Sequence, residues 1–343
     1  MYPMHTSSDF FVPTIDISPY VFGDSTSAAD GTGRRSLAAD VDYACSTVGF
    51  MQILGHGVPE DTVAGLASAM DSFFGLDSAA KRAYICPPER NRGYTAPKSE
   101  SLSLSLGVES ATGMNDWFEA FNVGTGEPNI WPHSEGFQRA VEEYFAEAAR
   151  VARTLTSVFA DALGVSPNMF PDITDRSLDT LRMNNYALEP GLHVPDTELT
   201  GMSEHTDYGL VTVLWADRVP GLQVLGTDRR WHDVQPVEGA MLVNLGDLTA
   251  RLTNDRWMST LHRVRPPITD GTSQRRRSAA FFHDGNLDAV IAPLPSCIEP
   301  GDVARYEPVT VAEHIHAKLA GSRGGTANAS ATREAERVRN AVI

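Results

Sequence analysis

Two stretches, LRMNNY at residues 181–186 and SAAFFH at residues 278–283, begin and end a region of short β-rich runs. Further runs of this kind lie between them, at residues 210–215, 222–225, 241–245 and 263–264. β-branched and aromatic residues recur in these runs, and turn-forming residues separate them, as in sheets built from short strands. The pattern predicts an α+β protein whose core is a double-sheet barrel or jelly roll.

The residues before this region predict helices that pack on one sheet. Residues 137–163 give the clearest helix, because apolar residues recur at three- and four-residue spacing and Gly164 supplies a stop. The other predicted elements are helices at 35–45 and 60–74 and strands at 12–17 and 49–54. Residues 90–129 lack a regular pattern and are expected to form a loop that acts as a lid or pocket wall.

The chain is expected to have three parts. Residues 10–130 form an N-terminal, partly helical region, and residues 131–310 form the jelly-roll core with its long supporting helix. Residues 311–343 form a C-terminal helix and tail. Residues 321–343 contain few apolar side chains, so a loose tail or a marginal helix without an assigned role is expected there.

The composition is that of a globular protein. It has 343 residues, of which 42% are hydrophobic, and no apolar run of the length that a membrane span needs. The net charge of −16 disfavours a nucleic-acid partner, because phosphate binding needs a basic surface. Cys45, Cys86 and Cys297 form no CxxC pair, which argues against a disulfide framework. We therefore expect a cytoplasmic protein with a small-molecule substrate and no membrane partner; the oligomeric state is left open.

The triplet HTD at residues 205–207 is a candidate metal-binding element. His205 and Asp207 project from the same side of an extended backbone, and His262 follows after several predicted strands. Two imidazoles and one carboxylate on one face of an octahedron leave three positions open, which is the arrangement of non-haem Fe(II) oxygenases. Alone the triplet is weak evidence, because HxD occurs by chance and other histidines lie nearby. These are His193, His232 and His283.

A second candidate element is RRS at residues 276–278. In a strand, Arg276 and Ser278 share one face, while Arg277 lies on the other. A planar guanidinium binds a carboxylate through two hydrogen bonds, and the hydroxyl adds a donor, so the pair suits the distal carboxylate of a dicarboxylic acid. Without the metal triad, these arginines would be interpreted as a solvated patch.

Together the motifs resemble the isopenicillin N synthase-like branch of the Fe(II)/2-oxoglutarate-dependent dioxygenases over residues 12–283. The resemblance implies a double-stranded β-helix (jelly roll) with an additional N-terminal helical region. Seven motifs follow one another in the family's order. They are VPTID (12–16), GFMQILGHG (49–57), RGY (92–94), LRMNNY (181–186), HTD (205–207), STLHRV (259–264) and RRS (276–278). Seven ordered matches are much more specific than any one of them.

The resemblance implies a role for each matching residue. The implied residues are the catalytic iron ligands His205, Asp207 and His262, the 2-oxoglutarate carboxylate-binding pair Arg276 and Ser278, and the pocket-lining Asn184 and Tyr186. Strand packing is the alternative for the last two, because Asn185 stands where many relatives have Tyr. The implied cofactors and co-substrates are Fe(II), 2-oxoglutarate and O2.

The resemblance also implies a reaction. It is the hydroxylation of an unactivated C–H bond in a small specialised metabolite, with release of succinate and CO2. Two alternatives stay open. The first is an Fe(II) oxidase of the same scaffold that carries out desaturation or ring closure, with or without 2-oxoglutarate, and the second is a non-catalytic metal-binding jelly roll.

Other residues near these motifs receive weaker interpretations. Candidate substrate contacts are the RGY turn at 92–94, Trp117, Phe121 and Phe282, although core packing explains each aromatic residue equally well. His56 is expected to fix its turn by hydrogen bonding. Asp247 and Arg263 are interpreted as a loop cap and a member of a surface salt bridge, respectively.

Overall fold

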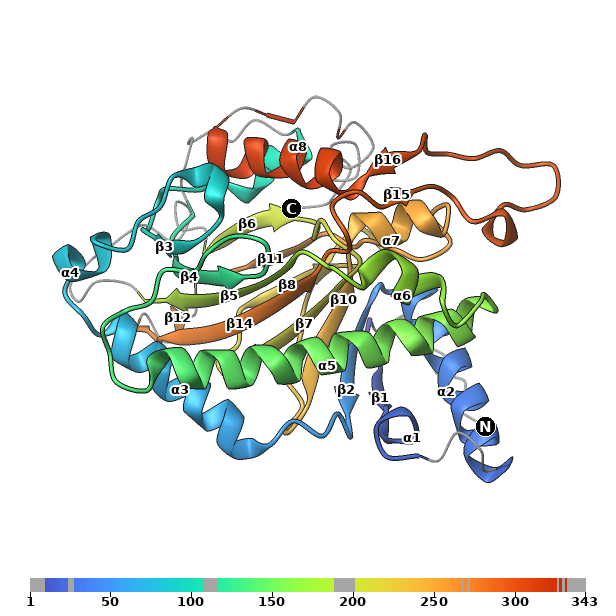
Figure 1. Cartoon of the computed structure of the whole chain (residues 1–343), viewed down its shortest axis with the longest axis horizontal. Coiled ribbons are helices and arrows are strands. Elements are labelled where there is room, and N and C mark those ends of the chain that lie inside the picture. The colour runs from blue at the N-terminus through green and yellow to red at the C-terminus, as the bar shows by residue number, and fades with distance from the viewer. Residues whose placement is uncertain are drawn as a thin grey trace.

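An eight-stranded sheet forms the framework of the protein (Figure 1). The computed structural model describes residues 10–23, 28–107, 116–187, 201–266, 268–269, 272–325, 327–328 and 331. Within them the strand order of this major sheet is β1-β2-β10-β7-β14-β5-β4-β3. The bounds are β1 Thr14–Asp16, β2 Phe50–Leu54, β10 Met241–Leu245, β7 Val211–Ala216, β14 Arg276–His283, β5 Asp179–Tyr186, β4 Glu119–Gly124 and β3 Gly93–Thr95. Among these described strands, the β1–β2 pair is parallel and the other pairs are antiparallel.

Three helices cover the outer face of the major sheet. They are α2 (Ala28–Thr47), α3 (Glu60–Phe74) and α5 (Phe137–Leu163). Figure 1 shows α5 running along the sheet with α2 and α3 beside it. Its apolar stripe is buried there, so the stripe is core packing. The bounds of α3 and α5 agree with the prediction, whereas α2 begins seven residues before the predicted start at 35 and ends two residues after the predicted end at 45.

A smaller sheet faces the inner side of the major sheet and completes the jelly roll. Its strand order is β6-β11-β8-β9. The bounds are β6 Met202–His205, β11 His262–Val264, β8 Leu222–Leu225 and β9 Trp231–Asp233. The main apolar core lies between the major sheet and its helices. A separate apolar cluster, which includes Phe50, Tyr186 and Val264, fills part of the space between the two sheets. A cavity lined by both sheets occupies the rest.

The segment expected to be a loop, residues 90–129, is different in the structure. It contributes β3 and β4 to the major sheet and a 3-10 helix, η2 (Leu102–Leu106), to the cavity wall. These strands were missed because pairing between distant segments, β3 with β4 and β4 with β5, determines them rather than a local pattern. The wall function expected of the segment is present, since Asn91, Leu102 and Asn122 line the cavity. Residues 108–115 lie outside the described part.

Residues 311–324 form a C-terminal helix, and the tail or marginal helix expected from residue 321 begins inside it. Helix α8 (Val311–Gly324) begins with a capping box between Thr310 and Glu313. It packs against η2, above the sheet edge in Figure 1. Gly321 fits this contact closely, because a Cβ there would lie 2.7 Å from the carbonyl oxygen of Leu104. Residues 332–343 are outside the described ranges, so the expectation for them stays a prediction.

The remaining elements connect these layers. They are α1 Ser18–Val21, α4 Ser78–Arg82, η1 Pro88–Arg90, α6 Met169–Thr174, α7 Asp247–Leu252, β12 Ile268–Thr269, β13 Thr272–Ser273, β15 Val290–Ile291, η3 Pro295–Cys297 and β16 Val309–Thr310. No helix in the described part of the chain combines the length and the apolar character of a transmembrane span.

Candidate active site

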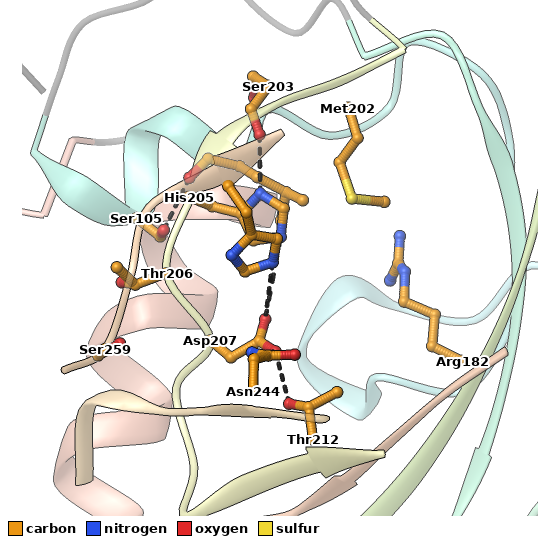
Figure 2. Close-up of polar contacts among 12 residues, drawn as sticks. Ser105, Arg182, Met202, Ser203, His205, Thr206, Asp207, Thr212, Asn244 and Ser259 are labelled. Carbon is orange, nitrogen blue, oxygen red and sulfur yellow. Dashed lines mark hydrogen bonds and ion pairs between the residues drawn. The ribbon is translucent and has the colours of Figure 1, made fainter. Parts of the chain in front are cut away.

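Three buried side chains from two distant segments of the sequence converge at one end of the smaller sheet. This sheet, β6-β11-β8-β9, is called the minor sheet below. His205 ends β6, Asp207 follows it, and His262 begins β11, directly opposite His205 in the strand register. Potential ligand atoms of the three residues all lie within 4.8 Å of one another. His205 Nε2 is 3.9 Å and His262 Nε2 is 3.7 Å from Asp207 Oδ1. Figure 2 shows the imidazole of His205 facing the carboxylate of Asp207.

Hydrogen bonds fix the tautomer of both imidazoles. His205 Nδ1 is 2.7 Å from the carbonyl oxygen of Ser203, and His262 Nδ1 is 3.1 Å from that of Thr260. A carbonyl oxygen only accepts, so each Nδ1 carries a proton, and in the neutral imidazole Nε2 is the nitrogen left to bind a metal. Burial, with the neighbouring His262 acting in the same direction, lowers the pKa of His205 to about 3. His205 is therefore a neutral nitrogen ligand near pH 7.

The carboxylate of Asp207 is held from the major sheet. Asn244 Nδ2 on β10 donates to Asp207 Oδ2 at 2.6 Å, and Thr212 Oγ1 on β7 donates to the same oxygen (Figure 2). Oδ1 is the oxygen that faces the two imidazoles. Two imidazole nitrogens and one carboxylate oxygen, with no thiolate, form a donor set that fits a ferrous ion.

A buried cation lies in the same cavity. Arg276 on β14 is 2% exposed, and its guanidinium lies 5.1 Å from the centre of the Tyr186 ring. Within the described residues it forms no ion pair, and its polar contact is Nη1 with Ser278 Oγ at 3.4 Å. Arg277, on the other face of the strand, instead pairs with Asp71 at 2.8 Å. The predicted division of the two faces of RRS is confirmed, but Arg277 is ion-paired rather than simply solvated.

Strand β5, which pairs with β14, supplies the other two cavity residues that were expected from the sequence. Asn184 and Tyr186 are both buried and line the cavity, opposite Ser278 and Arg276 in the β5–β14 register. Arg182 lies on the same face of β5 and donates from Nε to Asn184 Oδ1 at 3.1 Å. Arg182 was not among the residues selected from the sequence, although its alternation with Asn184 and Tyr186 was a signal for it.

Arg182 belongs to a charged cluster at the end of the cavity away from Arg276. Its Nη2 lies 2.6 Å from Glu100 Oε2, and Arg323 Nε on α8 lies 2.9 Å from Glu100 Oε1. Burial raises the pKa of Glu100, but attraction to both guanidinium groups outweighs it, so the pKa lies below its usual value. On β5 Arg182 is four residues from Tyr186, roughly 13 Å along the strand. The two cationic ends are therefore separate.

Two atoms at this second end have unused hydrogen-bonding capacity. Asn122 Oδ1 and Arg323 Nη2 are buried and have no hydrogen-bond partner among the described residues. Both residues line the cavity, where Phe282 also lies. An acceptor and a donor are therefore available beside an aromatic ring, and a ligand could satisfy both.

The structure decides between substrate contact and core packing for the aromatic candidates. Phe121 and Tyr94 pack on Phe73 in the core, and Trp117 lies under Lys98 rather than in the cavity, so Phe282 is the one of these candidates that lines it. The alternative of core packing is therefore confirmed for Phe121 and Tyr94.

Asp247 and Arg263, which were not assigned to the site from the sequence, have partners other than those expected. Asp247 is 3% exposed and pairs with Lys318 at 2.6 Å, so it is not a loop cap. Arg263 donates to Gln223 and lies over the ring of Trp231, which replaces the expected surface salt bridge. Pairing across the sheet and with α8, which the sequence does not reveal, accounts for both differences.

Three other histidines considered in the sequence analysis have hydrogen-bond partners of their own. His56 accepts from the backbone N–H of Val58 and contacts the carbonyl of Gly239, which confirms its predicted role in the turn. His232 contacts Asp228 at 2.9 Å, and His283 contacts Asp179 at 2.7 Å. His193 lies outside the described residues.

Comparisons with known proteins agree with this geometry. Residues 12–142 match the family described as non-haem dioxygenase in morphine synthesis N-terminal, and residues 178–285 match the 2OG-Fe(II) oxygenase superfamily. The 2-oxoglutarate-Fe(II) type oxidoreductase hxnY of Emericella nidulans is 32% identical over 328 residues, which cover 91% of this chain and 90% of that protein.

Solved structures show the same relationship. A full-length Neurospora crassa protein in complex with alpha-KG is similar with a TM-score of 0.79 and 26% identity, covering 93% of this chain and 100% of that one. The complex of the same protein with alpha-KG and thymine gives a TM-score of 0.78 at 26% identity, with coverage of 92% and 98%. This chain belongs to the 2OG-Fe(II) oxygenase superfamily and is an enzyme that uses Fe(II), 2-oxoglutarate and O2.

Proposed function

We propose that this enzyme hydroxylates an unactivated C–H bond of a small metabolite, with His205, Asp207 and His262 as its iron ligands. Arg276 and Ser278 bind the distal carboxylate of 2-oxoglutarate in this proposal. The observation that carries it is a buried guanidinium without a carboxylate partner among the described residues, in the same cavity as three convergent metal ligands. An unpaired buried cation is costly, and the dicarboxylate would neutralise it.

The residues of the chain bind and orient the reactants. Iron and 2-oxoglutarate supply the oxidising power when bound, and 2-oxoglutarate is oxidised to succinate and CO2 as one oxygen atom of O2 enters the substrate. Asn244 and Thr212 fix the orientation of the Asp207 carboxylate. Tyr186, whose ring lies beside the Arg276 guanidinium, and Asn184, opposite Ser278, are proposed as walls of the 2-oxoglutarate pocket.

The ligand assignment is tested by metal binding as well as turnover. His205→Ala and Asp207→Ala should each remove measurable Mn(II) binding and 2-oxoglutarate-dependent succinate formation. His232→Ala is the matched control, because His232 lies on the same sheet but contacts Asp228 instead of the triad. Wild-type Mn(II) affinity in folded His205→Ala protein would show that the ligands are misassigned.

The type of oxidation is decided by the product. Hydroxylation adds one oxygen to the substrate, whereas desaturation or ring closure removes two hydrogens. The product mass separates these outcomes, and O2 uptake with and without 2-oxoglutarate shows whether substrate oxidation depends on the keto acid. Substrate oxidation at full rate without 2-oxoglutarate would contradict the assignment of Arg276.

We further propose that the substrate is a small planar heterocycle carrying N–H and C=O groups, bound at the end of the cavity away from Arg276. The similar Neurospora crassa structure contains thymine, which has these groups. In this chain Asn122 Oδ1 could accept from the N–H and Arg323 Nη2 could donate to the C=O, while Phe282 lies in the same cavity.

Thymine is the first compound to test. The enzyme with Fe(II) and 2-oxoglutarate should release more succinate when thymine is present, with a product heavier by one oxygen. Toluene, a methylated ring without the polar groups, is the comparison compound and should not stimulate succinate release. Asn122→Leu should raise the KM for thymine with little change in the KM for 2-oxoglutarate. Equal stimulation by both compounds would contradict polar recognition.

A further inference from the structure

Asp247 is a buried carboxylate beside the candidate metal ligands. It is the first residue of α7 and is 3% exposed. Its Oδ2 lies 2.6 Å from Lys318 Nζ and 3.7 Å from His314 Nε2, both on α8. Lys318 itself is 1% exposed. Asp247 and Lys318 thus form a buried ion pair.

The other hydrogen bonds of Asp247 reach both segments that carry metal ligands. Thr206, between the two ligands of the HTD motif, donates from Oγ1 to Asp247 Oδ2 at 3.2 Å. Ser259, three residues before the third ligand, donates from Oγ to Asp247 Oδ1 at 2.7 Å. The backbone N–H of Asp247 donates to the carbonyl of Asp207 at 2.8 Å. In Figure 2, Thr206 and Ser259 lie together on the far side of the HTD segment from Arg182.

Helix α8 connects this ion pair with the cavity wall. Four of its residues line the cavity: Ile315, Leu319, Ser322 and Arg323. Lys318 lies between them in the sequence but points to Asp247. Helix α8 therefore forms part of the cavity wall and also carries Lys318, which pairs with Asp247. Asp247 in turn joins the two segments that carry the metal ligands.

We propose that Asp247 and Lys318 are positioning residues for the metal triad, through which α8 sets the affinity for the metal ion. This inference rests on the proposed iron ligands. Without Lys318, Asp247 would be a buried carboxylate that has lost its closest counter-charge, and its side chain would have to move. That movement would disturb its hydrogen bonds with Thr206 and Ser259, which hold the two segments in register. Groups that hold metal ligands in this way commonly contribute 10- to 100-fold to metal affinity.

The test is the Mn(II) affinity of Lys318→Met, measured from the EPR signal of free Mn(II). We expect the dissociation constant to rise at least tenfold. Ser259→Ala, which removes one hydroxyl and leaves the ion pair, should give a smaller rise. It also serves as the second variant if Lys318→Met does not fold. An unchanged Mn(II) affinity in Ser259→Ala and in any folded Lys318→Met protein would overturn the proposal.

A matched control separates positioning from general stability. Lys81 Nζ lies 2.7 Å from Glu119 Oε2 in another buried ion pair, and neither residue lines the cavity. Lys81→Met should lower the melting temperature but leave Mn(II) affinity within about twofold of the wild type, below the effect expected of a group that holds a ligand. An equal loss of affinity in Lys81→Met and Lys318→Met would show a general effect and overturn the inference. The His205→Ala protein tests the ligands separately, so failure of the proposed function is recognised on its own.

Discussion

Arg276 is the most informative single residue, because its environment is unusual for a cation. A buried guanidinium normally has a carboxylate partner, as Arg182 and Arg323 do in Glu100. The guanidinium of Arg276 instead contacts the ring of Tyr186 and the hydroxyl of Ser278. In the proposed function, the distal carboxylate of 2-oxoglutarate completes the pair and offsets this cost.

Replacement of Arg276 should therefore act on 2-oxoglutarate. Arg276→Met is expected to raise the KM for 2-oxoglutarate by a factor of at least ~30, because a buried charge-assisted pair contributes about 2 kcal/mol or more. Arg277→Met is the control, since this neighbour pairs with Asp71 on the other face of β14. Initial rates of succinate formation at varied 2-oxoglutarate give both values. Equal KM values in the two variants would contradict the assignment.

Asp116 makes a prediction about pH. It is 2% exposed and accepts hydrogen bonds from the backbone N–H groups of Leu102 and Ser203. Burial nevertheless raises the pKa of Asp116 from 3.8 to about 7. The folded protein then keeps a proton between about pH 4 and 7 that the unfolded chain has lost. Folding stability from this residue is therefore largest at low pH and falls as the pH rises to 7.

Asp116→Asn removes this titration. Compared with the variant, the wild type should lose stability between pH 5 and pH 7 by about 1.4 kcal/mol per pH unit. Carboxylates common to both proteins cancel in the difference. Urea unfolding of the metal-free proteins at several pH values provides the measurement. Parallel pH curves for the two proteins would show that Asp116 titrates at its ordinary value.

Helix α8 shows how one element depends on small residues. A Cβ at Gly321 would lie 2.7 Å from the carbonyl oxygen of Leu104, whereas no described atom lies within 4 Å of a Cβ at Gly324. Gly321→Ala should destabilise the protein by about 1–3 kcal/mol, because α8 must move away from η2. Gly324→Ala in the same helix should be neutral or stabilising by up to about 1 kcal/mol. Thermal unfolding of both variants tests this, and equal stabilities would mean that the α8–η2 contact is unimportant.

The elements that could be predicted from sequence are those with a long or strict pattern. Helices α3 and α5 were predicted with the observed bounds, because their apolar periodicity extends over several turns. Strands β3, β6 and β9 were missed, since three or four residues do not establish an alternation and their pairing partners are distant. Tertiary pairing, not local preference, determines such strands.

The candidate site was predictable where the chemistry of a ligand favours certain residue types. A ferrous ion favours His and Asp, and a dicarboxylate favours Arg, so the triad and Arg276 could be selected from the sequence. The structure brings them into one cavity. The Glu100–Arg182–Arg323 cluster and the Asp247–Lys318 pair were missed because each joins segments more than 70 residues apart without a motif. The division at residues 10–130, 131–310 and 311–343 stays a prediction.

The two ligands should together stabilise the whole molecule, because they bridge its two sheets. His205 and His262 lie on the minor sheet, while Arg276 lies on the major sheet. A metal-bound 2-oxoglutarate therefore joins both sheets, and Mn(II) with 2-oxoglutarate should raise the melting temperature more than the sum of the separate effects. Saturation at about one hundred times the dissociation constant corresponds to about 2.7 kcal/mol.

Two variants show how much each ligand contributes to this rise in melting temperature. Arg276→Met should keep the shift produced by Mn(II) and lose the additional shift produced by 2-oxoglutarate. His205→Ala should lose both, because 2-oxoglutarate without the metal has only one of its two anchors. Differential scanning calorimetry of the three proteins with each ligand and with both gives the comparison. If 2-oxoglutarate stabilised Arg276→Met as much as the wild type, its distal carboxylate would have to bind elsewhere in the cavity.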